Sequence, residues 1–306
     1  MTRILGVATC ARVDVAERFV PLFERLAPEL DLRAPQDIDR PEDVRFMLTF
    51  VPGDDAFTAY PNLEAVFSIG AGQDAIDACP SRPAGLPVYR LEDPDQALQM
   101  AAFCAFHVQW HQREMFATRA AQARGEWLRK LTGLSPQARR IGVMGFGHMG
   151  RAVARGLVSL GYPVLGYARR MPDPVEPGVT HFTEGQMDDF LSQSDILINV
   201  LPLTAQTRGL IDADFLAKLP QGAALIHVGR GGQVDEAALV AALDSGHLSG
   251  ASVDVFETEP LPTDHPFWAH PKVFMTPHNA CIPTPEAVVQ SVRSRMVPER
   301  CKAVQA

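Results

Sequence analysis

Three short segments carry side chains that could act together on a small molecule. They are I-H-V-G-R ending at Arg230, E-P-L-P beginning at Glu259 and T-P-H ending at His278, and each follows an apolar run typical of a buried strand. An arginine binds a carboxylate, an imidazole transfers protons near neutral pH, and a carboxylate orients that imidazole. Ligands of open parallel sheets bind at the carboxyl ends of the strands. The segments therefore predict one site containing Arg230, Glu259 and His278.

A glycine-rich turn near the middle of the chain has the spacing of a dinucleotide-binding loop. It follows the apolar run 141–144 and consists of Gly145, Phe146, Gly147, His148, Met149 and Gly150. The first glycine permits the tight turn, the second lets a pyrophosphate approach, and the third lets helix pack on strand. Helix-forming residues follow as far as Gly161, so a pyrophosphate would lie at a helix N-terminus. We expect a dinucleotide site here rather than a merely structural turn.

The end of the next strand indicates which dinucleotide binds. An NAD-selective unit has a carboxylate there, about 20 residues after the turn, for the ribose 2′-hydroxyl. This chain has Ala168, Arg169 and Arg170 instead. Guanidinium groups bind a 2′-phosphate, which a carboxylate would repel. The sequence favours NADP(H), with NAD(H) still possible, although two arginines after a strand could also be ordinary solvated charge.

Composition limits the class of protein. The chain has 306 residues, of which 46% are hydrophobic and 21% charged, as in a globular protein with two ordinary domains. Its net charge of -8 argues against a nucleic-acid partner. No apolar stretch approaches the ~20 residues that a membrane span needs. The five cysteines are scattered without C-x-x-C or zinc spacing, which predicts reduced thiols, a cytoplasmic location and no metal site.

Short apolar runs alternate with amphipathic segments in both halves, which predicts two parallel-sheet α/β domains of Rossmann-like and flavodoxin-like type. In the first half we expect strands at 3–8, 44–51, 65–69 and 88–91, with a helix over 15–26. In the second half we expect strands at 140–144, 164–167, 196–201, 224–228, 252–256 and 273–276, with a helix over 236–243.

Two segments connect the predicted domains. A long helix over 95–130, beginning after Pro94, carries the chain from one to the other. After Pro277 the tail has apolar residues at 288, 289, 292 and 296, which predicts a helix that returns to the first domain. The expected division is therefore 1–96 plus 281–306 as the substrate domain and 97–280 as the dinucleotide-binding domain. Two crossings make a hinged cleft, which is a common ligand site.

With these motifs the chain resembles the D-isomer-specific 2-hydroxy acid dehydrogenases over nearly all its length. The glycine turn is followed, in the family's order, by R-G-x-x-V-D from Arg230, D-V-F-x-x-E-P-L-P from Asp254 and T-P-H-x-A from Thr276. The stretches G-A-G-Q-D from Gly70 and Y-R-L-E-D-P from Tyr89, with the two arginines after the strand, resemble most the NADPH-dependent glyoxylate/hydroxypyruvate reductases.

The resemblance implies reduction of a small 2-keto acid to a D-2-hydroxy acid and a role for each matched residue. Arg230 would bind the substrate carboxylate, His278 would protonate the ketone oxygen, and Glu259 would fix the imidazole tautomer. The implied cofactor contacts beyond the turn and the arginines are Leu201, Pro202, Val228, Gly229, Arg230, Asp254 (to the nicotinamide carboxamide) and His278. The backbone amides of Ala71 and Gly72 would meet the substrate carboxylate. A homodimer through the cofactor domain is also implied.

Other interpretations remain. Some relatives of this fold are corepressors, so a nucleotide-sensing binding protein is an alternative, although the intact Arg230, Glu259 and His278 favour catalysis. The substrate could be glyoxylate, hydroxypyruvate, phenylpyruvate or a bulkier 2-keto acid, because His227 and Asn279 replace residues common in the family beside the site. The β-hydroxy acid dehydrogenases share the glycine turn but place it at the N-terminus before a large helical domain, so they are set aside.

Overall fold

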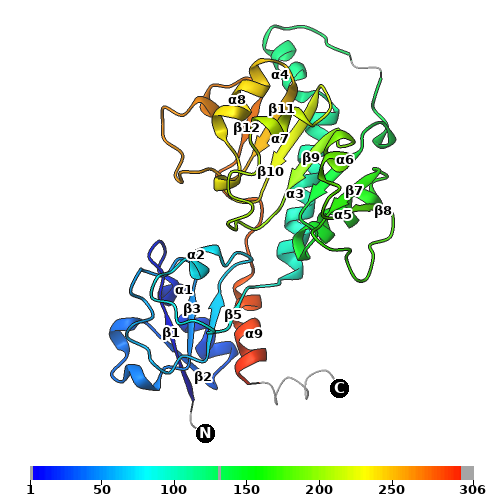
Figure 1. Ribbon diagram of the computed structural model, residues 1–306. Coiled ribbons are helices and arrows are strands. Elements are labelled where there is room, and N and C mark those ends of the chain that lie inside the picture. The colour runs from blue at the N-terminus through cyan, green and yellow to red at the C-terminus, as the bar shows by residue number, and fades with distance from the viewer. Residues whose placement is uncertain (1–2, 130–131, 298–306) are drawn as a thin grey trace. The chain divides into compact units, whose positions relative to one another are not determined.

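The computed structural model describes residues 3–129 and 132–297. By its internal contacts the chain divides into two compact units, Met1–Gln96 with Ile282–Ala306, and Ala97–Cys281. Each unit contains one parallel sheet (Figure 1). The predicted fold class of two parallel α/β units is confirmed. The division places Cys281 in the second unit, one residue beyond the expected boundary.

The sheet of the first unit has the strand order β2-β1-β3-β4-β5, which is the flavodoxin-like order. Its strands are β1 Ile4–Ala8, β2 Leu30–Arg33, β3 Phe46–Thr49, β4 Ala65–Ser68 and β5 Val88–Tyr89. The strand β2 was not expected from the sequence. It lies at the edge of the sheet and alternates apolar with charged residues over only four positions, so it lacks the apolar run that marks the central strands.

The helices of the first unit are α1 Val15–Leu26, α2 Asp74–Asp77 and α9 Pro285–Met296. Asp14 caps α1, since its Oδ1 accepts from the backbone N of Glu17 at 2.8 Å. The helix α9 contacts α1, and its Val288, Val289 and Val292 are buried in the same apolar cluster as the inner face of α1. The C-terminal helix thus belongs to the first unit, as its apolar spacing predicted (Figure 1).

The sheet of the second unit has the strand order β12-β11-β10-β9-β6-β7-β8, a Rossmann order extended by a seventh strand. Its strands are β6 Ile141–Met144, β7 Val164–Tyr167, β8 Val179–Phe182, β9 Ile196–Asn199, β10 Ala223–His227, β11 Leu248–Val253 and β12 Val273–Met275. The edge strand β8 was not expected, and β11 begins and ends earlier than the expected 252–256. The order reverses between β6 and β9, where dinucleotides bind in such sheets.

Helices lie on both faces of this second sheet (Figure 1). They are α3 Pro94–Gln112, α4 Met115–Ala123, α5 His148–Ser159, α6 Met187–Ser192, α7 Ala213–Ala217 and α8 Glu236–Asp244. Short 3-10 helices occur at Pro35–Asp37, Pro41–Asp43, Pro136–Ala138, Gly231–Gln233 and Pro266–Trp268. Apolar side chains of β6, β9 and β10 contribute to separate clusters on the two faces, which is why these strands read as continuous apolar runs.

The expected single helix over 95–130 is wrong. The chain adopts a left-handed conformation at Glu114, with φ of 52°, and this ends α3 and starts α4 as a separate helix. The helix α4 ends at Ala123, and the expected end at Lys130 lies outside the described residues. The helix α3 begins at Pro94, one residue earlier than expected. None of the described helices is long and apolar enough to cross a membrane.

One buried carboxylate, Asp93, joins the starts of α3 and α9. Its Oδ1 accepts from the backbone N of Asp95 at 3.0 Å, and its Oδ2 accepts from the backbone N and Oγ1 of Thr284 at 2.9 and 3.1 Å. Thr284 in turn caps α9. Burial opposes ionisation of Asp93, but these hydrogen bonds outweigh it and lower the pKa of the carboxyl group. Both passages of the chain out of the first unit are therefore held at one residue.

Candidate active site

The glycine turn has the geometry that a pyrophosphate site requires. Gly145 adopts a φ of 105°, which only glycine tolerates well, and its N–H donates to the carbonyl of Tyr167 at 3.0 Å. A Cβ on Gly150 would lie 1.8 Å from the carbonyl oxygen of Gly145, so helix and strand pack as closely as the motif predicts. Gly147 caps α5, and a Cβ there would meet nothing within 4 Å. This open space beside the first N–H groups of a 12-residue helix fits a dinucleotide phosphate.

The residues after β7 fit a phosphorylated ribose. Arg169 and Arg170 are exposed, and β7 lies directly beside β6, the strand that enters the glycine turn. Within the described part of the chain, neither guanidinium group makes an ion pair or a side-chain hydrogen bond. Ala168 donates its N–H to the carbonyl of Phe182 at 3.1 Å, so its backbone is fixed to the neighbouring strand. Two unengaged cations thus stand where an NAD-selective unit would have a carboxylate.

His278 and Glu259 form a hydrogen-bonded pair. The Nδ1 of His278 lies 2.8 Å from Oε2 of Glu259, and Oε1 of Glu259 accepts from the backbone N of Phe256 at 3.1 Å. Because a carboxylate only accepts, Nδ1 carries the proton and Nε2 is the atom available to a ligand. The side chain of His278 is 40% exposed and that of Glu259 is 24% exposed, so the imidazole is accessible to solvent while its carboxylate partner is more buried. This is the arrangement of a proton donor with its orienting acid.

The loop that carries His278 is built around Asp254. This side chain is buried, and its Oδ1 accepts from Oγ1 of Thr276 at 2.6 Å and from the N of Asn279 at 2.9 Å. Its Oδ2 accepts from the N of Ala280 at 3.1 Å. His278 itself adopts a left-handed φ of 51° and donates its N–H to the carbonyl of Asp254 at 2.8 Å. The carboxylate thus braces a strained loop, and its implied contact with a nicotinamide carboxamide stays a prediction.

Arg230 follows β10. In the sheet β10 lies beside β11, and β11 lies beside β12. Its Nη1 donates to the carbonyl of Gly229 at 2.8 Å, and its backbone N donates to Oε1 of Gln233 at 2.9 Å. A Cβ on Gly231 would lie 1.8 Å from the carbonyl carbon of Phe256, so the Arg230 turn packs directly on the loop after β11. The ends of β10, β11 and β12 therefore bring the three predicted segments to one edge of the sheet.

The remaining predicted residues are also at strand ends. Leu201 and Pro202 follow β9, and Val228 and Gly229 follow β10, with Val228 buried in a cluster that includes Phe146 of the glycine turn. Ala71 and Gly72 belong to the first unit and follow β4, where Oγ of Ser68 donates to the carbonyl of Gly72 at 2.6 Å.

Sequence reasoning missed the buried amides of Asn199 and Gln233 beside Arg230. A polar residue ending the apolar run I-L-I-N, and a glutamine within R-G-G-Q-V-D, were the available signals.

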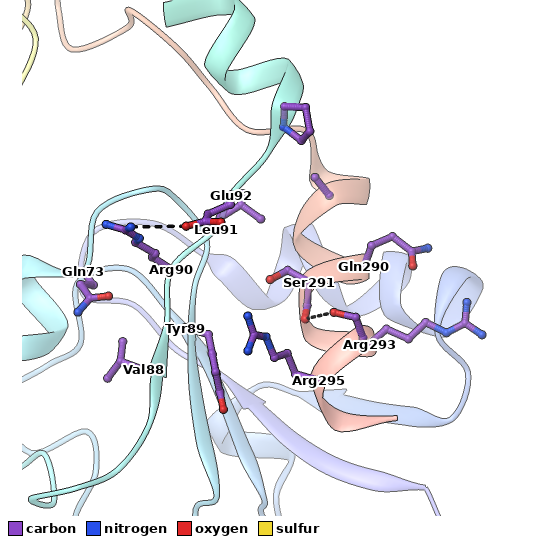
Figure 2. Close-up of a pocket in the computed structure, with 13 residues that line it drawn as sticks. Gln73, Val88, Tyr89, Arg90, Leu91, Glu92, Gln290, Ser291, Arg293 and Arg295 are labelled. Atoms are coloured by element: carbon purple, nitrogen blue, oxygen red, sulfur yellow. Dashed lines mark hydrogen bonds and ion pairs between the residues drawn. The ribbon is translucent and has the colours of Figure 1, made fainter. Parts of the chain in front are cut away.

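A cavity of about 770 Å³ lies in the first unit between β5 and α9 (Figure 2). Its wall includes Tyr89, over whose ring the Arg295 guanidinium lies at 4.3 Å, as well as Arg90 and Glu92. None of the predicted site residues lines it.

Among residues 3–129 and 132–297, no group of three or more His, Cys, Asp and Glu could hold a metal ion. The chemistry thus concentrates at the strand ends of the second unit.

A Rossmann sheet with a glycine turn and an imidazole–carboxylate pair at neighbouring strand ends is the framework of a nicotinamide-dependent dehydrogenase. The sequence model of the D-isomer specific 2-hydroxyacid dehydrogenase NAD binding domain matches residues 106–280. The chain belongs to this family of NAD(P)-dependent oxidoreductases, as its motif order predicted.

Relatives and solved structures extend the match over both units. A protein named glyoxylate/hydroxypyruvate reductase A from Photorhabdus laumondii is 34% identical over 287 residues, covering 91% of this chain and 90% of its own. A D-isomer specific 2-hydroxyacid dehydrogenase from Xanthobacter autotrophicus, solved with NADPH and MES, is 38% identical with a TM-score of 0.89, covering 98% and 96%. An NADPH-dependent glyoxylate/hydroxypyruvate reductase from Sinorhizobium meliloti, solved with NADP and sulfate, is 30% identical with a TM-score of 0.86, covering 98% and 96%.

Proposed function

We propose that this protein reduces a small 2-keto acid of the glyoxylate or hydroxypyruvate type to the D-2-hydroxy acid, with NADPH as the hydride donor. The observation that carries the proposal is the 2.8 Å pair between Nδ1 of His278 and Glu259, at strand ends next to the Arg230 turn. The names of the relatives and the NADPH in a solved structure 38% identical to this chain support it.

When bound, the nicotinamide supplies the hydride. His278 delivers a proton from Nε2 to the ketone oxygen, because Nδ1 is held by Glu259. Glu259 keeps the ring in one orientation and stabilises the imidazolium form that donates the proton. Arg230 binds the substrate carboxylate and polarises the carbonyl group. Its positive charge stabilises the negative charge that develops on the carbonyl oxygen. In the oxidative direction His278 accepts the proton. A positioned acid of this kind contributes roughly 10²–10⁴-fold to the rate.

The proposed cofactor contacts follow the same strand ends. The N–H groups at the start of α5 would hold the pyrophosphate, and Arg169 and Arg170 would bind the 2′-phosphate. Leu201 and Pro202 would line the nicotinamide path. From the first unit, the backbone amides of Ala71 and Gly72 are the proposed contacts to the substrate carboxylate.

Steady-state assays with a panel of 2-keto acids, each run with NADPH and with NADH, test this proposal. Glyoxylate or hydroxypyruvate should be reduced fastest, with NADPH preferred, and phenylpyruvate slowest. The variant His278→Ala should lose about 10²–10⁴-fold in kcat, and NADPH binding followed by nucleotide fluorescence should stay within a few-fold. Absence of turnover with every keto acid, despite tight NADPH binding, would favour a nucleotide-sensing role instead. A preference for phenylpyruvate would identify a dehydrogenase of bulkier substrates.

We also propose a homodimer through the second unit. Phe106 of α3 is 51% exposed and lies beside Trp110, whose ring stacks on Phe274 of the edge strand β12 at 4.9 Å between centroids. An aromatic surface of this kind at a sheet edge favours association with a second copy. Light scattering coupled to gel filtration should give twice the chain mass of 33.4 kDa, and Phe106→Glu should shift the measured mass towards that of the monomer.

A cytoplasmic location, inferred from the scattered cysteines, stays a prediction. The four described cysteines are free thiols, and Cys301 lies outside the described residues.

A further inference from the structure

Three polar side chains, Asn199, His227 and Gln233, are buried together behind the Arg230 turn. Each is at most 1% exposed. Asn199 ends β9 and His227 ends β10, the strand beside it, while Gln233 ends the short helix after Arg230. Buried polar groups are stabilising only when they are hydrogen-bonded, so the contacts of this trio decide what it does.

Asn199 is at the centre of the trio, and its side-chain amide is fully used. Its Nδ2 donates to Nδ1 of His227 at 3.1 Å and to Oε1 of Gln233 at 2.9 Å. Its Oδ1 accepts from the backbone N of Leu201 at 3.2 Å. The amide therefore connects the ends of two strands with the first residue of the segment that we place along the nicotinamide path.

Gln233 and His227 hold the backbone on both sides of that connection. The Nε2 of Gln233 donates to the carbonyls of Leu201 and Pro202 at 3.2 and 3.0 Å, and its Oε1 accepts from the backbone N of Arg230 at 2.9 Å. The Nε2 of His227 lies 3.0 Å from the carbonyl oxygen of Arg230. Both backbone polar groups of Arg230 are thus bound by side chains that also bind, directly or through Asn199, the Leu201–Pro202 segment.

The ring of His227 has one tautomer that satisfies its partners. The Nδ1 faces the amide nitrogen of Asn199, which can only donate, so Nδ1 accepts, and Nε2 carries the hydrogen that reaches the Arg230 carbonyl. Burial lowers the pKa of His227 to about 4, although the hydrogen bond to that carbonyl opposes the shift. The ring is therefore neutral at physiological pH and works as a fixed donor and acceptor, not as a proton carrier.

The backbone of Gly229 packs closely against the trio. A Cβ on Gly229 would lie 2.3 Å from Oε1 of Gln233 and 3.1 Å from Nδ2 of Asn199. The carbonyl oxygen of Leu201 would lie 3.0 Å from the same Cβ, so a side chain at this position would displace the network. The Leu201–Pro202 segment and the Arg230 backbone are therefore held by the same set of buried side chains.

We propose that Asn199, His227 and Gln233 are positioning residues that couple the cofactor-binding segment Leu201–Pro202 to the substrate-binding Arg230. The inference rests on the proposed function, since it assigns the two ends of the network to cofactor and keto acid. The coupling makes binding at each end dependent on the same hydrogen bonds. Loss of the network weakens both NADPH binding and keto-acid binding, without removing any group that touches either molecule.

Two variants break the network and two serve as comparisons. His227→Leu removes the ring donor and acceptor, and Gln233→Glu keeps the size of the side chain but turns an acceptor towards the carbonyls of Leu201 and Pro202. His227→Asn breaks the network in part, because an asparagine amide can offer an acceptor at the position of Nδ1 but is too short to place a donor at the position of Nε2. His111→Leu is the matched control in the same unit, since it removes a buried histidine that is bonded to Ser252 at 2.9 Å and makes no hydrogen bond to the trio.

The measurements are KM and kcat for the keto acid, NADPH Kd by fluorescence, and the unfolding midpoint of each variant. For His227→Leu and Gln233→Glu we expect roughly tenfold or larger increases in both KM and NADPH Kd, since a broken buried hydrogen bond leaves unpaired partners. For His227→Asn we expect increases in both constants that are smaller than those of His227→Leu. For His111→Leu we expect both constants within about threefold of the parent protein and a lower unfolding midpoint.

A purely structural role gives the opposite pattern. The proposal is overturned if His227→Leu and Gln233→Glu lower the unfolding midpoint as His111→Leu does but leave KM and NADPH Kd unchanged. It is also overturned if KM rises while NADPH Kd does not, because the two ends would then be independent. Should the parent protein reduce no keto acid, the proposed function fails, and the NADPH Kd of the variants still decides whether the network supports the cofactor segment. Should His227→Leu not fold, Gln233→Glu decides alone.

Discussion

Three buried histidines make the stability of the second unit fall as the pH falls. His107, His111 and His227 are between 1% and 8% exposed, and burial lowers the pKa values to about 4, about 3 and about 4. In the unfolded chain the same groups titrate near 6.5. The unfolded state therefore binds more protons below that value, so the stabilising contribution is complete above pH 6.5 and is lost as the pH falls towards 4.

The size of the effect follows from these values. On unfolding, each histidine takes up roughly a quarter of a proton at pH 7 and close to one proton at pH 5, and integrated over this range the uptake lowers the free energy of unfolding by about 2 kcal/mol. The three together lower it by about 6 kcal/mol, which is comparable to the whole stability of an ordinary domain, roughly 5–15 kcal/mol. We therefore expect the second unit to lose most of its stability at pH 5.

Urea unfolding at pH 7, 6 and 5 measures this directly, because all three tryptophans, Trp110, Trp127 and Trp268, belong to the second unit and report on it by fluorescence. The variant His111→Leu removes one of the titrating rings, so about 2 kcal/mol of the difference between pH 7 and pH 5 should disappear.

The matched control is Ser252→Ala, which removes the same hydrogen bond but leaves the ring. It should lower stability at both pH values by a similar amount and keep the full pH dependence. Equal pH dependence in His111→Leu and the parent protein would refute the assignment of proton uptake to the buried rings.

The other predictions concern the cofactor site and the catalytic pair. Replacing Arg169 and Arg170 together by alanine should raise KM for NADPH roughly tenfold or more and leave KM for NADH within about twofold, because two charge-assisted hydrogen bonds to the 2′-phosphate are lost; equal effects on both cofactors would contradict this. Gly150→Ala should lower the unfolding midpoint, since its Cβ would lie 1.8 Å from a backbone oxygen, whereas Gly147→Ala should keep the midpoint and weaken NADPH binding. Glu259→Gln should lower kcat by about tenfold or more with NADPH Kd unchanged, because an amide holds the imidazolium less strongly than a carboxylate; retained kcat would remove Glu259 from the mechanism.

The sequence predicted the central strands and the glycine turn because each leaves a local signal. A strand buried on both faces must be apolar throughout, and a turn with φ of 105° must contain glycine. The strands β2 and β8 were not predicted. Both lie at the edge of a sheet, and their residues alternate between apolar and polar or are partly polar, so neither forms an apolar run. The break between α3 and α4 escaped because Glu114 adopts a left-handed conformation without a glycine or proline to mark it.

The catalytic candidates could be predicted from the sequence, whereas the residues that support them could not. Arg230, Glu259 and His278 were predicted because titratable residues after apolar runs are unusual, and the structure places them after adjacent strands. The support from Asn199 and Gln233 was not predicted, since a lone amide in a sequence has no visible partner. Its role depends on contacts across 34 positions, from Asn199 to Gln233, which only the folded chain brings together. His227 was noticed only as a departure from the family pattern.

The first unit is assembled from two separate stretches of the chain, with α9 supplying three valines to its core. During translation, the whole of Ala97–Cys281 must leave the ribosome before α9 can join α1, an interval of roughly 10 to 40 s at elongation rates of about 5–20 residues per second. In that time the amino-terminal segment has strands and α1 but an uncovered apolar surface. The second unit, continuous in sequence, is free to fold first. A nascent chain of this protein is therefore a candidate for chaperone binding at the end that was made earliest.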